Sequence, residues 1–160
     1  MSRRIIKLGK WNNKILEWEV LKENDFELLV VCRTSVDKRK FDSDSSNNSW
    51  KKSELRRFLQ EVFYKKAFSV EEKQKIISTK LKDVNGSKDN VFVLSYKEVS
   101  TLFLGGDDYE YNDKSCGRCA WTRTKINDSI YHGYSSGCWC QNRSTYIYSV
   151  RPAMYIDARI

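Results

Sequence analysis

Four of the five cysteines in this 160-residue chain form two close pairs near its C-terminal end. One pair is Cys116-Gly-Arg-Cys119, and the other is Cys138-Trp-Cys140. Each short spacing lets two sulfurs approach one ion, and two such pairs complete a tetrahedral zinc site with sulfur about 2.3 Å from the metal. We therefore expect Cys116, Cys119, Cys138 and Cys140 to hold a structural zinc ion, with His132 as an alternative ligand.

The same cysteines have other interpretations. They are compatible with half-buried free thiols, or with a disulfide formed after purification. A thiol-dependent enzyme that uses His132 as its base is a further alternative. A redox motif at Cys116–Cys119 would need a thiol at the N-terminus of a helix that follows a strand. The surrounding sequence is instead typical of a loop followed by a strand, which disfavours the redox interpretation.

The motifs of the common enzyme classes are absent from the sequence. It contains no glycine-rich phosphate loop, no Gly-x-Ser-x-Gly, no His-Glu-x-x-His and only one histidine. The acidic stretch Asp107-Asp-Tyr-Glu110 lacks the apolar surroundings that would move two carboxyl pKa values apart. We expect this stretch to be a solvated loop and the protein to be non-enzymatic.

Aromatic and arginine side chains gather in the same C-terminal region. Tyr, Trp and Arg dominate the hot spots of protein interfaces. We therefore expect the loops between Gly105 and Asn142, with the nearby arginines, to supply a contact surface for another protein. The candidate contact residues are Tyr109, Tyr111, Arg118, Tyr131, Tyr134, Trp139 and Arg143.

The chain is basic, with 29 Lys and Arg residues against 21 Asp and Glu and a net charge of +8. Pairs of basic residues surround the first two expected helices, which makes nucleic-acid binding through this Lys/Arg-rich helical face an alternative function. The aromatics there mostly belong to the apolar stripe, whereas a nucleic-acid site would want them interleaved for stacking. A solvated helix face is the favoured interpretation. The basic pairs are Lys51-Lys52, Arg56-Arg57, Lys65-Lys66, Lys73 with Lys75, and Lys80 with Lys82.

Three early segments have the pattern of strands. Arg4–Leu8 is a short apolar and basic run, and Leu16–Val20 alternates apolar with acidic residues. Phe26–Cys32 is apolar enough to be a central buried strand. Later segments expected to be strands are Val91–Leu94, Ala120–Thr124, Ile130–Tyr134 and Tyr146–Ile156.

Three helices are expected. The first is predicted by apolar residues at helical spacing between Leu55 and Phe63. Capping boxes at Ser69-Val-Glu-Glu72 and Ser95-Tyr-Lys-Glu98 open the second and third helices, the second continuing through Ile76 and Ile77. The segments Asp42–Asn48 and Val84–Asn90 are expected to be polar loops.

These elements predict an α+β fold with a small, twisted, mostly antiparallel sheet, two to three helices and a loop-rich C-terminal half. We expect a single domain over residues 1–160, in which 1–104 form a scaffold of strands and helices and 105–160 form the loop-rich region with closing strands. Arg123 and Arg151 lie in apolar, strand-like contexts, so we expect them to be hydrogen-bonded structural residues. No apolar run approaches the ~20 residues of a membrane helix, and the first residues lack the apolar segment of a signal peptide. We expect a cytoplasmic location and no membrane partner.

Several segments together resemble the bacterial and phage domain-of-unknown-function family 6273. Their order and rough spacing agree with the family pattern over nearly the whole chain. They are Trp18-Glu-Val-Leu21, Ser53-Glu-Leu-Arg-Arg-Phe-Leu-Gln60, Ala67-Phe68, Ser69-Val-Glu-Glu72, Val91-Phe-Val-Leu-Ser95 with Glu98-Val99, Trp121-Thr-Arg-Thr124 and Val150-Arg-Pro-Ala-Met154.

The resemblance implies a mixed α+β fold similar to the C-type-lectin-like fold, in which a long loop region projects from a small twisted sheet. The chain departs from the family pattern in three places: a short aromatic stretch before the last strands, Ala120-Trp121 where a tryptophan pair is expected, and the dense cysteine cluster. We expect a binding domain that acts through protein–protein contacts. Size and family context suggest a phage-encoded inhibitor of a host defence protein, working in the host cytoplasm.

Overall fold

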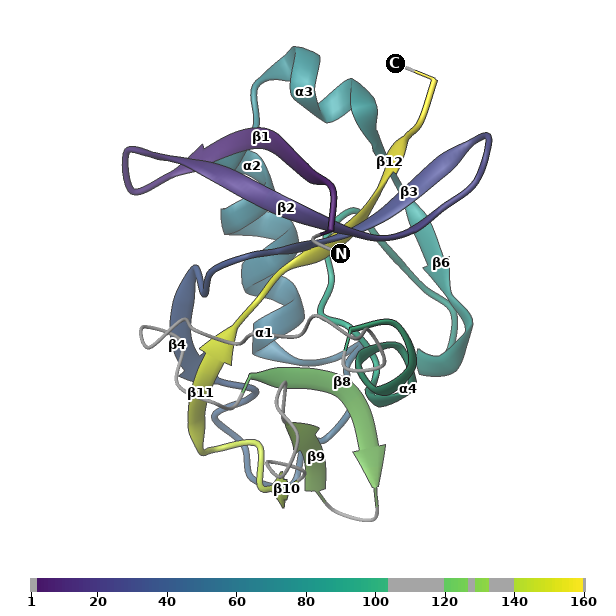
Figure 1. The fold of residues 1–160 in the computed structure, drawn as a ribbon. Coiled ribbons are helices and arrows are strands. Elements are labelled where there is room, and N and C mark those ends of the chain that lie inside the picture. Colours follow the sequence, from purple (N-terminus) through teal and green to yellow (C-terminus); the bar gives the residue numbers. More distant parts are fainter. Residues whose placement is uncertain (1–2, 104–119, 127–128, 133–139, 160) are drawn as a thin grey trace.

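The computed structural model of the chain describes residues 3–103, 120–126, 129–132 and 140–159, and for residues 103, 126, 129–132 and 140–142 it describes the main chain alone. The predicted α+β class is confirmed: a curled, antiparallel, five-stranded sheet is combined with short helices (Figure 1). Within the described ranges, no helix is long and apolar enough to cross a membrane.

The main sheet has the strand order β1-β2-β3-β12-β5, and all its described pairs are antiparallel. Its middle strand is the predicted buried strand, in which every residue after Glu27 is buried. The main chain of β12 pairs with it so that Met154 lies opposite Val30. The strands of this sheet are β1 (Ile5–Trp11), β2 (Lys14–Glu23), β3 (Glu27–Cys32), β12 (Ala153–Asp157) and β5 (Ile76–Ile77).

Smaller sheets complete the β structure. In Figure 1 the five-stranded sheet occupies the upper part of the molecule, and β8 to β10 lie below it. The smaller sheets are β10 (Cys140–Asn142) with β9 (Ser129–His132) and β8 (Trp121–Ile126), β11 (Ile147–Val150) with β4 (Asp37–Lys40), and β6 (Thr79–Leu81) with β7 (Ser87–Asp89).

The first helix runs from Glu54 to Ala67 in three stretches: α1 (Glu54–Arg57), the π-helical η1 (Phe58–Phe63) and α2 (Tyr64–Ala67). Ser53 is its N-cap, and its Oγ accepts a hydrogen bond from the amide of Arg56 at 3.0 Å. The predicted apolar stripe faces the sheet, where Trp11 packs against Phe58 and Phe63.

The second helix, α3 (Val70–Lys75), begins at the predicted capping box, because Ser69 and Glu72 exchange both hydrogen bonds. Its predicted continuation through Ile76 and Ile77 is wrong. Both isoleucines form β5, where they pair with Ile156 and Tyr155 of β12. Two consecutive β-branched residues favour a strand when a sheet edge lies within reach.

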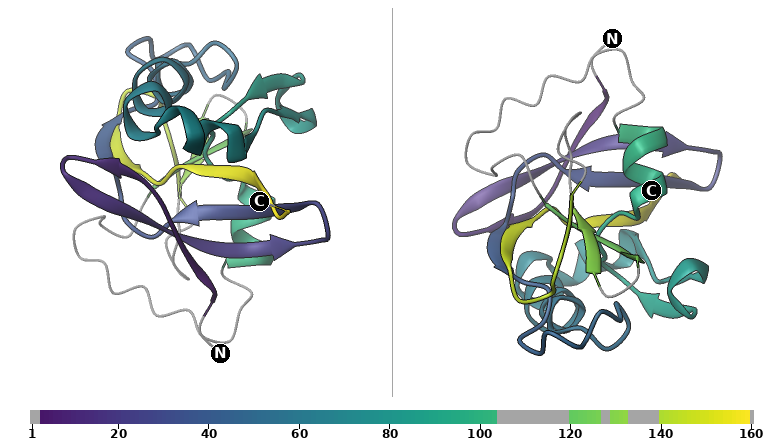
Figure 2. Two further views of the ribbon diagram at one scale, coloured as in Figure 1. Left: turned by 90° about the horizontal axis from the view of Figure 1, so that it is seen from above. Right: turned by 90° about the horizontal axis from the view of Figure 1, so that it is seen from below.

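The third helix starts at the second capping box and comprises α4 (Tyr96–Glu98) and the π-helical η3 (Val99–Phe103). The two views of Figure 2 place the helix of residues 54–67 on one face of the main sheet and the α4–η3 helix on the other. Side chains from both helices therefore close the core, to which Leu59 and Val99 contribute fully buried surface.

The segment after α3 differs from the sequence-based expectation. Residues 79–89 form a hairpin, β6 and β7, rather than a loop alone, with the short 3-10 turn η2 (Lys82–Val84) at its tip. Asn85 and Gly86 follow the turn with φ of 58° and 65°, which is the backbone conformation these residue types tolerate best. Val91–Leu94 is fully buried as predicted, but it is an extended segment with a single bridge, Phe92 to Ala153, rather than a strand.

The predicted strand Tyr146–Ile156 is interrupted at Arg151 and Pro152, so β11 and β12 belong to different sheets. Proline has no amide hydrogen to donate to a strand ladder. Arg151 is buried as predicted, and its Nε donates to the carbonyl of Cys32 at 3.0 Å. This break turns the chain from the lower sheets into the main one.

Candidate functional site

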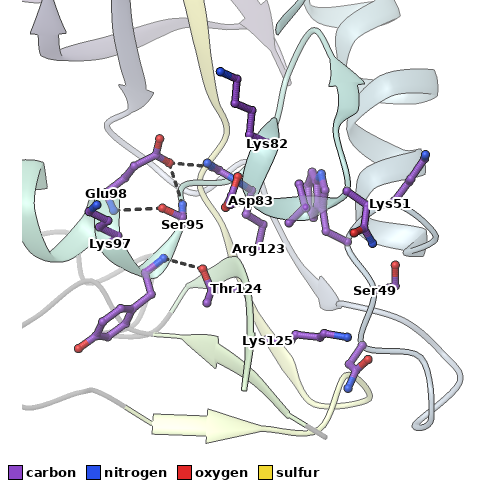
Figure 3. A pocket seen from close by; sticks show the side chains of 15 residues that line it. Ser49, Lys51, Lys82, Asp83, Ser95, Lys97, Glu98, Arg123, Thr124 and Lys125 are labelled. Carbon is purple, nitrogen blue, oxygen red and sulfur yellow. Dashed lines mark hydrogen bonds and ion pairs between the residues drawn. The ribbon is translucent and has the colours of Figure 1, made fainter. Parts of the chain in front are cut away.

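A groove of about 700 Å³ lies between four segments that are distant in the sequence. Its walls are the segment 48–51 before α1, the tip of the β6–β7 hairpin at 82–85, the start of α4 at 95–98, and residues 123–125 of β8. Figure 3 shows this arrangement from close by. We call this site the lysine groove because Lys51, Lys82, Lys97 and Lys125 line it.

Arg123 on β8 holds one side of the groove together. Its side chain is 4% exposed, and its Nη1 donates to Oε1 of Glu98 at 2.7 Å and to the carbonyl of Val93 at 2.8 Å. Its Nε lies 3.1 Å from Oδ2 of Asp83 on the hairpin tip. The guanidinium therefore joins β8 to α4 and to η2. This agrees with the expectation that Arg123 is a hydrogen-bonded structural residue.

The charge state of Arg123 follows from these contacts. Burial lowers the pKa of its guanidinium, but the negative charges and hydrogen bonds of Glu98 and Asp83 outweigh this and raise the pKa above its usual value. Arg123 thus stays protonated. One cation facing two carboxylates leaves this cluster with a net charge of −1.

The start of α4 is fixed by the same cluster. Glu98 Oε1, which binds Arg123, also accepts from the amide of Ser95 at 2.9 Å, while Ser95 Oγ accepts from the amide of Glu98 at 3.1 Å. Thr124 Oγ1 accepts from the amide of Tyr96 at 3.0 Å. The capping box and this hydrogen bond therefore fix the start of α4 against β8.

The opposite wall is anchored by a second buried ion pair. Asp89, at the end of β7, is fully buried and accepts from Nε of Arg56 at 2.7 Å and from Nε1 of Trp50 at 2.8 Å. Ser87 Oγ adds a hydrogen bond to the same carboxylate. Because Trp50 is locked in this way, the preceding residues and Lys51 have a defined position.

The four lysines of the groove are all exposed. Across the described part of the chain, no carboxylate lies within ion-pair distance of any of their ammonium groups. In Figure 3, Lys125 extends from β8 toward the side where Ser49 and Lys51 lie, and Lys97 lies beside Glu98. Five cationic side chains against two carboxylates give the lining a net charge of +3.

The residues that line the lysine groove are mainly polar or charged. Within the described residues the lining contains neither Cys nor His, and both of its carboxylates bind Arg123. Ammonium, hydroxyl and amide groups donate hydrogen bonds, so the lining is suited to anionic and polar ligands.

Most residues of the predicted contact surface lie outside the described part of the chain. Arg143 is described, and it is exposed just after β10. Tyr131 and Cys140 are placed by main chain alone, on β9 and β10, where Cys140 lies opposite His132. The residues outside the described ranges are Tyr109, Tyr111, Arg118, Tyr134 and Trp139.

The predicted zinc ligands Cys116, Cys119 and Cys138 also lie outside the described residues. Among the side chains that the structure describes, no group of three or more His, Cys, Asp or Glu is arranged to hold a metal ion. Cys32, the cysteine whose side chain is described, is fully buried in β3. The zinc site and the thiol-dependent enzyme stay predictions from the sequence.

The lysine groove was missed by sequence reasoning, which assigned Lys51 and Lys82 to a solvated helix face. A usable signal was present in two places. A buried arginine in an apolar strand requires carboxylate partners, and the capping box at Ser95 supplies one in Glu98. The positions of the four lysines relative to one another carried no such signal.

Comparison with known proteins gives one match. A family model described as Domain of unknown function (DUF6273) matches residues 20–158. No curated protein and no solved structure matches the chain.

Proposed function

The chain belongs to this family of unknown function, and we propose that it is a non-enzymatic binding domain that contacts another protein through the lysine groove. The observation that carries the proposal is that ion pairs fix the walls of the groove while its lysines stay exposed. Two ion pairs, Arg56 with the buried Asp89 and the buried Arg123 with Glu98, position the groove, while its exposed lysines bind nothing within the described chain.

Fixed walls matter because binding costs less free energy when the site is ordered beforehand. Trp50 and Arg123 need no rearrangement to present the neighbouring lysines. Exposed ammonium groups in a concave site also raise the rate of encounter with an anionic partner.

A narrower form of the proposal is that the chain is phage-encoded and inhibits a host defence protein. Its support is the size of the chain and the family to which it belongs. An inhibitor of this kind needs a binding surface and no catalytic group. The lysine groove supports the proposal by offering such a surface.

The experiment is affinity capture from a lysate of the cells in which the chain is expressed, with quantitative mass spectrometry of bound proteins. The groove variant K51E/K125E is compared with the control variant K65E/K66E, which makes the same charge change on the exposed face of α2. We expect the groove variant to lose a protein that the wild-type chain and the control both retain. Retention of every bound protein by the groove variant would contradict the proposal.

Nucleic-acid binding by the helical face is the second candidate, and the exposed Arg57, Lys65 and Lys66 favour it. Arg56 is engaged by Asp89, and the helix aromatics Phe58 and Phe63 are buried, so binding there would rest on phosphate contacts without stacking. Such binding weakens steeply as salt is raised, because each phosphate contact releases counterions. Salt-dependent binding of DNA or RNA that K65E/K66E abolishes would favour this candidate over the groove.

A further inference from the structure

We infer that the segment recognised by the lysine groove is acidic, a stretch of protein chain that carries several Asp or Glu side chains. The inference rests on the proposed function, because it names the chemistry of the partner at the same site. Charge, an internal carboxylate and the polar lining each support it.

Charge is the first argument. Lys51, Lys82, Lys97 and Lys125 are exposed, and the carboxylates of the lining are already bound by Arg123. An uncharged or basic segment would give these ammonium groups no ionic partner. An acidic segment supplies one carboxylate for each, and such contacts gain strength when the groove walls exclude water.

The second argument is the position of Asp83. This carboxylate is 43% exposed and reaches Arg123 from the solvent side, whereas Glu98 is 20% exposed and reaches it from within the wall. A partly exposed carboxylate at the groove surface thus already binds one cation of the lining, Arg123. An acidic partner would make contacts of the same kind with the lysines around it.

The aromatic and polar side chains of the lining favour an acidic peptide over a nucleic acid. A single-stranded nucleic acid binds by stacking its bases on aromatic faces as well as by charge. Trp50 is 2% exposed and donates to Asp89, so its ring is closed to stacking, and the other aromatic of the lining, Tyr96, is half-buried. The lining instead includes the amide of Asn85 and the hydroxyl of Ser49, groups that can hydrogen-bond to the carbonyl and amide groups of a peptide.

The test is fluorescence anisotropy with a labelled oligoglutamate of about ten residues, which spans about 33 Å when extended. A glycine–serine peptide of the same length and a single-stranded DNA of similar charge are measured beside it. We expect the oligoglutamate to bind the wild-type chain, K51E/K125E to weaken it about tenfold, and K65E/K66E to change it less than about twofold. Circular dichroism of both variants checks that they are folded.

Equal weakening by the two variants would overturn the inference, because it would show attraction by net charge alone. Tighter binding of the DNA than of the oligoglutamate, lost in K51E/K125E, would also overturn it and assign the groove to nucleic acid. If K51E/K125E loses a captured protein while wild type fails to bind oligoglutamate, the proposed function stands and the acidic inference fails. If oligoglutamate binds as expected but capture is unchanged in K51E/K125E, the proposed function fails and the groove is an anion site of another kind.

Discussion

Nε of Arg56 lies 2.7 Å from Oδ1 of Asp89, a fully buried carboxylate at the end of β7. Trp50 donates to the other oxygen of the same carboxylate. This contact joins the start of the first helix to the β6–β7 hairpin, whose tip carries Lys82 and Asp83. The ion pair of Arg56 and Asp89 thus sets the spacing of two groove walls that are more than thirty residues apart in the sequence.

Arg123 anchors the other walls, and its removal tests whether the groove depends on it. Arg123→Met leaves the half-buried carboxylate of Glu98 without its ion-pair partner. We therefore expect the free energy of unfolding to fall by about 3 kcal/mol. Chemical denaturation at neutral pH measures the loss. The control is Arg159→Met, which removes an exposed pair with Asp157 two residues away and should leave stability almost unchanged. Equal stability of the two variants would contradict the anchoring role.

The carboxylate of Glu72 predicts a pH dependence of stability. Burial raises the pKa of Glu72, but hydrogen bonds from the amides of Ser69 and Gly9, the hydroxyl of Ser69 and the nearby charge of Lys75 outweigh it and lower the pKa. A carboxyl pKa that is lower in the folded than in the unfolded chain adds stability above the unfolded value of about 4.3. That stability is lost as the pH falls through the folded-state pKa.

We therefore expect Glu72→Gln to destabilise the protein at neutral pH and to approach wild-type stability once the pH falls below the folded-state pKa of Glu72. Thermal melts across this range measure the difference. Glu71→Gln, at the exposed neighbouring position, serves as the control and should show no such trend. A Glu72→Gln penalty that stays constant with pH would contradict the assignment.

Gly9 on β1 has a φ of +79°, and a Cβ there would lie 2.6 Å from Cε1 of Phe68 and 2.9 Å from the carbonyl of Ala67. Both the backbone conformation and the close contact resist a side chain. We expect Gly9→Ala to cost more than about 2 kcal/mol in denaturant unfolding. Gly86→Ala, also at positive φ, meets only the flexible end of Lys80 and should cost about 1 kcal/mol. If Gly86→Ala were more destabilising than Gly9→Ala, the contact with Phe68 would not be what excludes a side chain at position 9.

The parts of the fold that local patterns decide were predictable from the sequence. The capping boxes at Ser69 and Ser95 and the buried strand ending at Cys32 depend on neighbouring residues, and all three are confirmed. Ile76 and Ile77 were assigned to a helix because their pairing partner, β12, lies almost eighty residues away. Only the assembled sheet shows that a strand edge is available to them.

In the candidate site too, some residues could be assigned from local sequence and others depend on long-range contacts. Arg123 could be assigned a paired role because burying a charge is costly wherever it occurs. Lys51 and Lys125, however, line one groove only because four distant segments pack together. No local sequence pattern predicts that packing. Polar exposed lysines carry no periodic signal, so a solvated face was the reasonable expectation for Lys51.

The cysteine spacing predicts a zinc ion that native mass spectrometry of freshly purified protein can detect. We expect the chain to carry one zinc ion, which Cys138→Ser with Cys140→Ser removes and the buried control Cys32→Ser retains. A mass equal to that of the chain alone would contradict the zinc site. Rapid alkylation of one thiol at neutral pH in that metal-free protein would favour the thiol-dependent alternative.

The central claim is that Lys51, Lys82, Lys97 and Lys125 contact carboxylates of a protein partner. A carbodiimide joins an amine to a carboxylate only when the two are in contact, so cross-linking of the full chain with oligoglutamate, followed by peptide mass spectrometry, tests the claim most directly. We expect cross-links to concentrate on these four lysines and to be suppressed by raised salt. Cross-links spread evenly over the exposed lysines, or concentrated on Lys65 and Lys66, would contradict it.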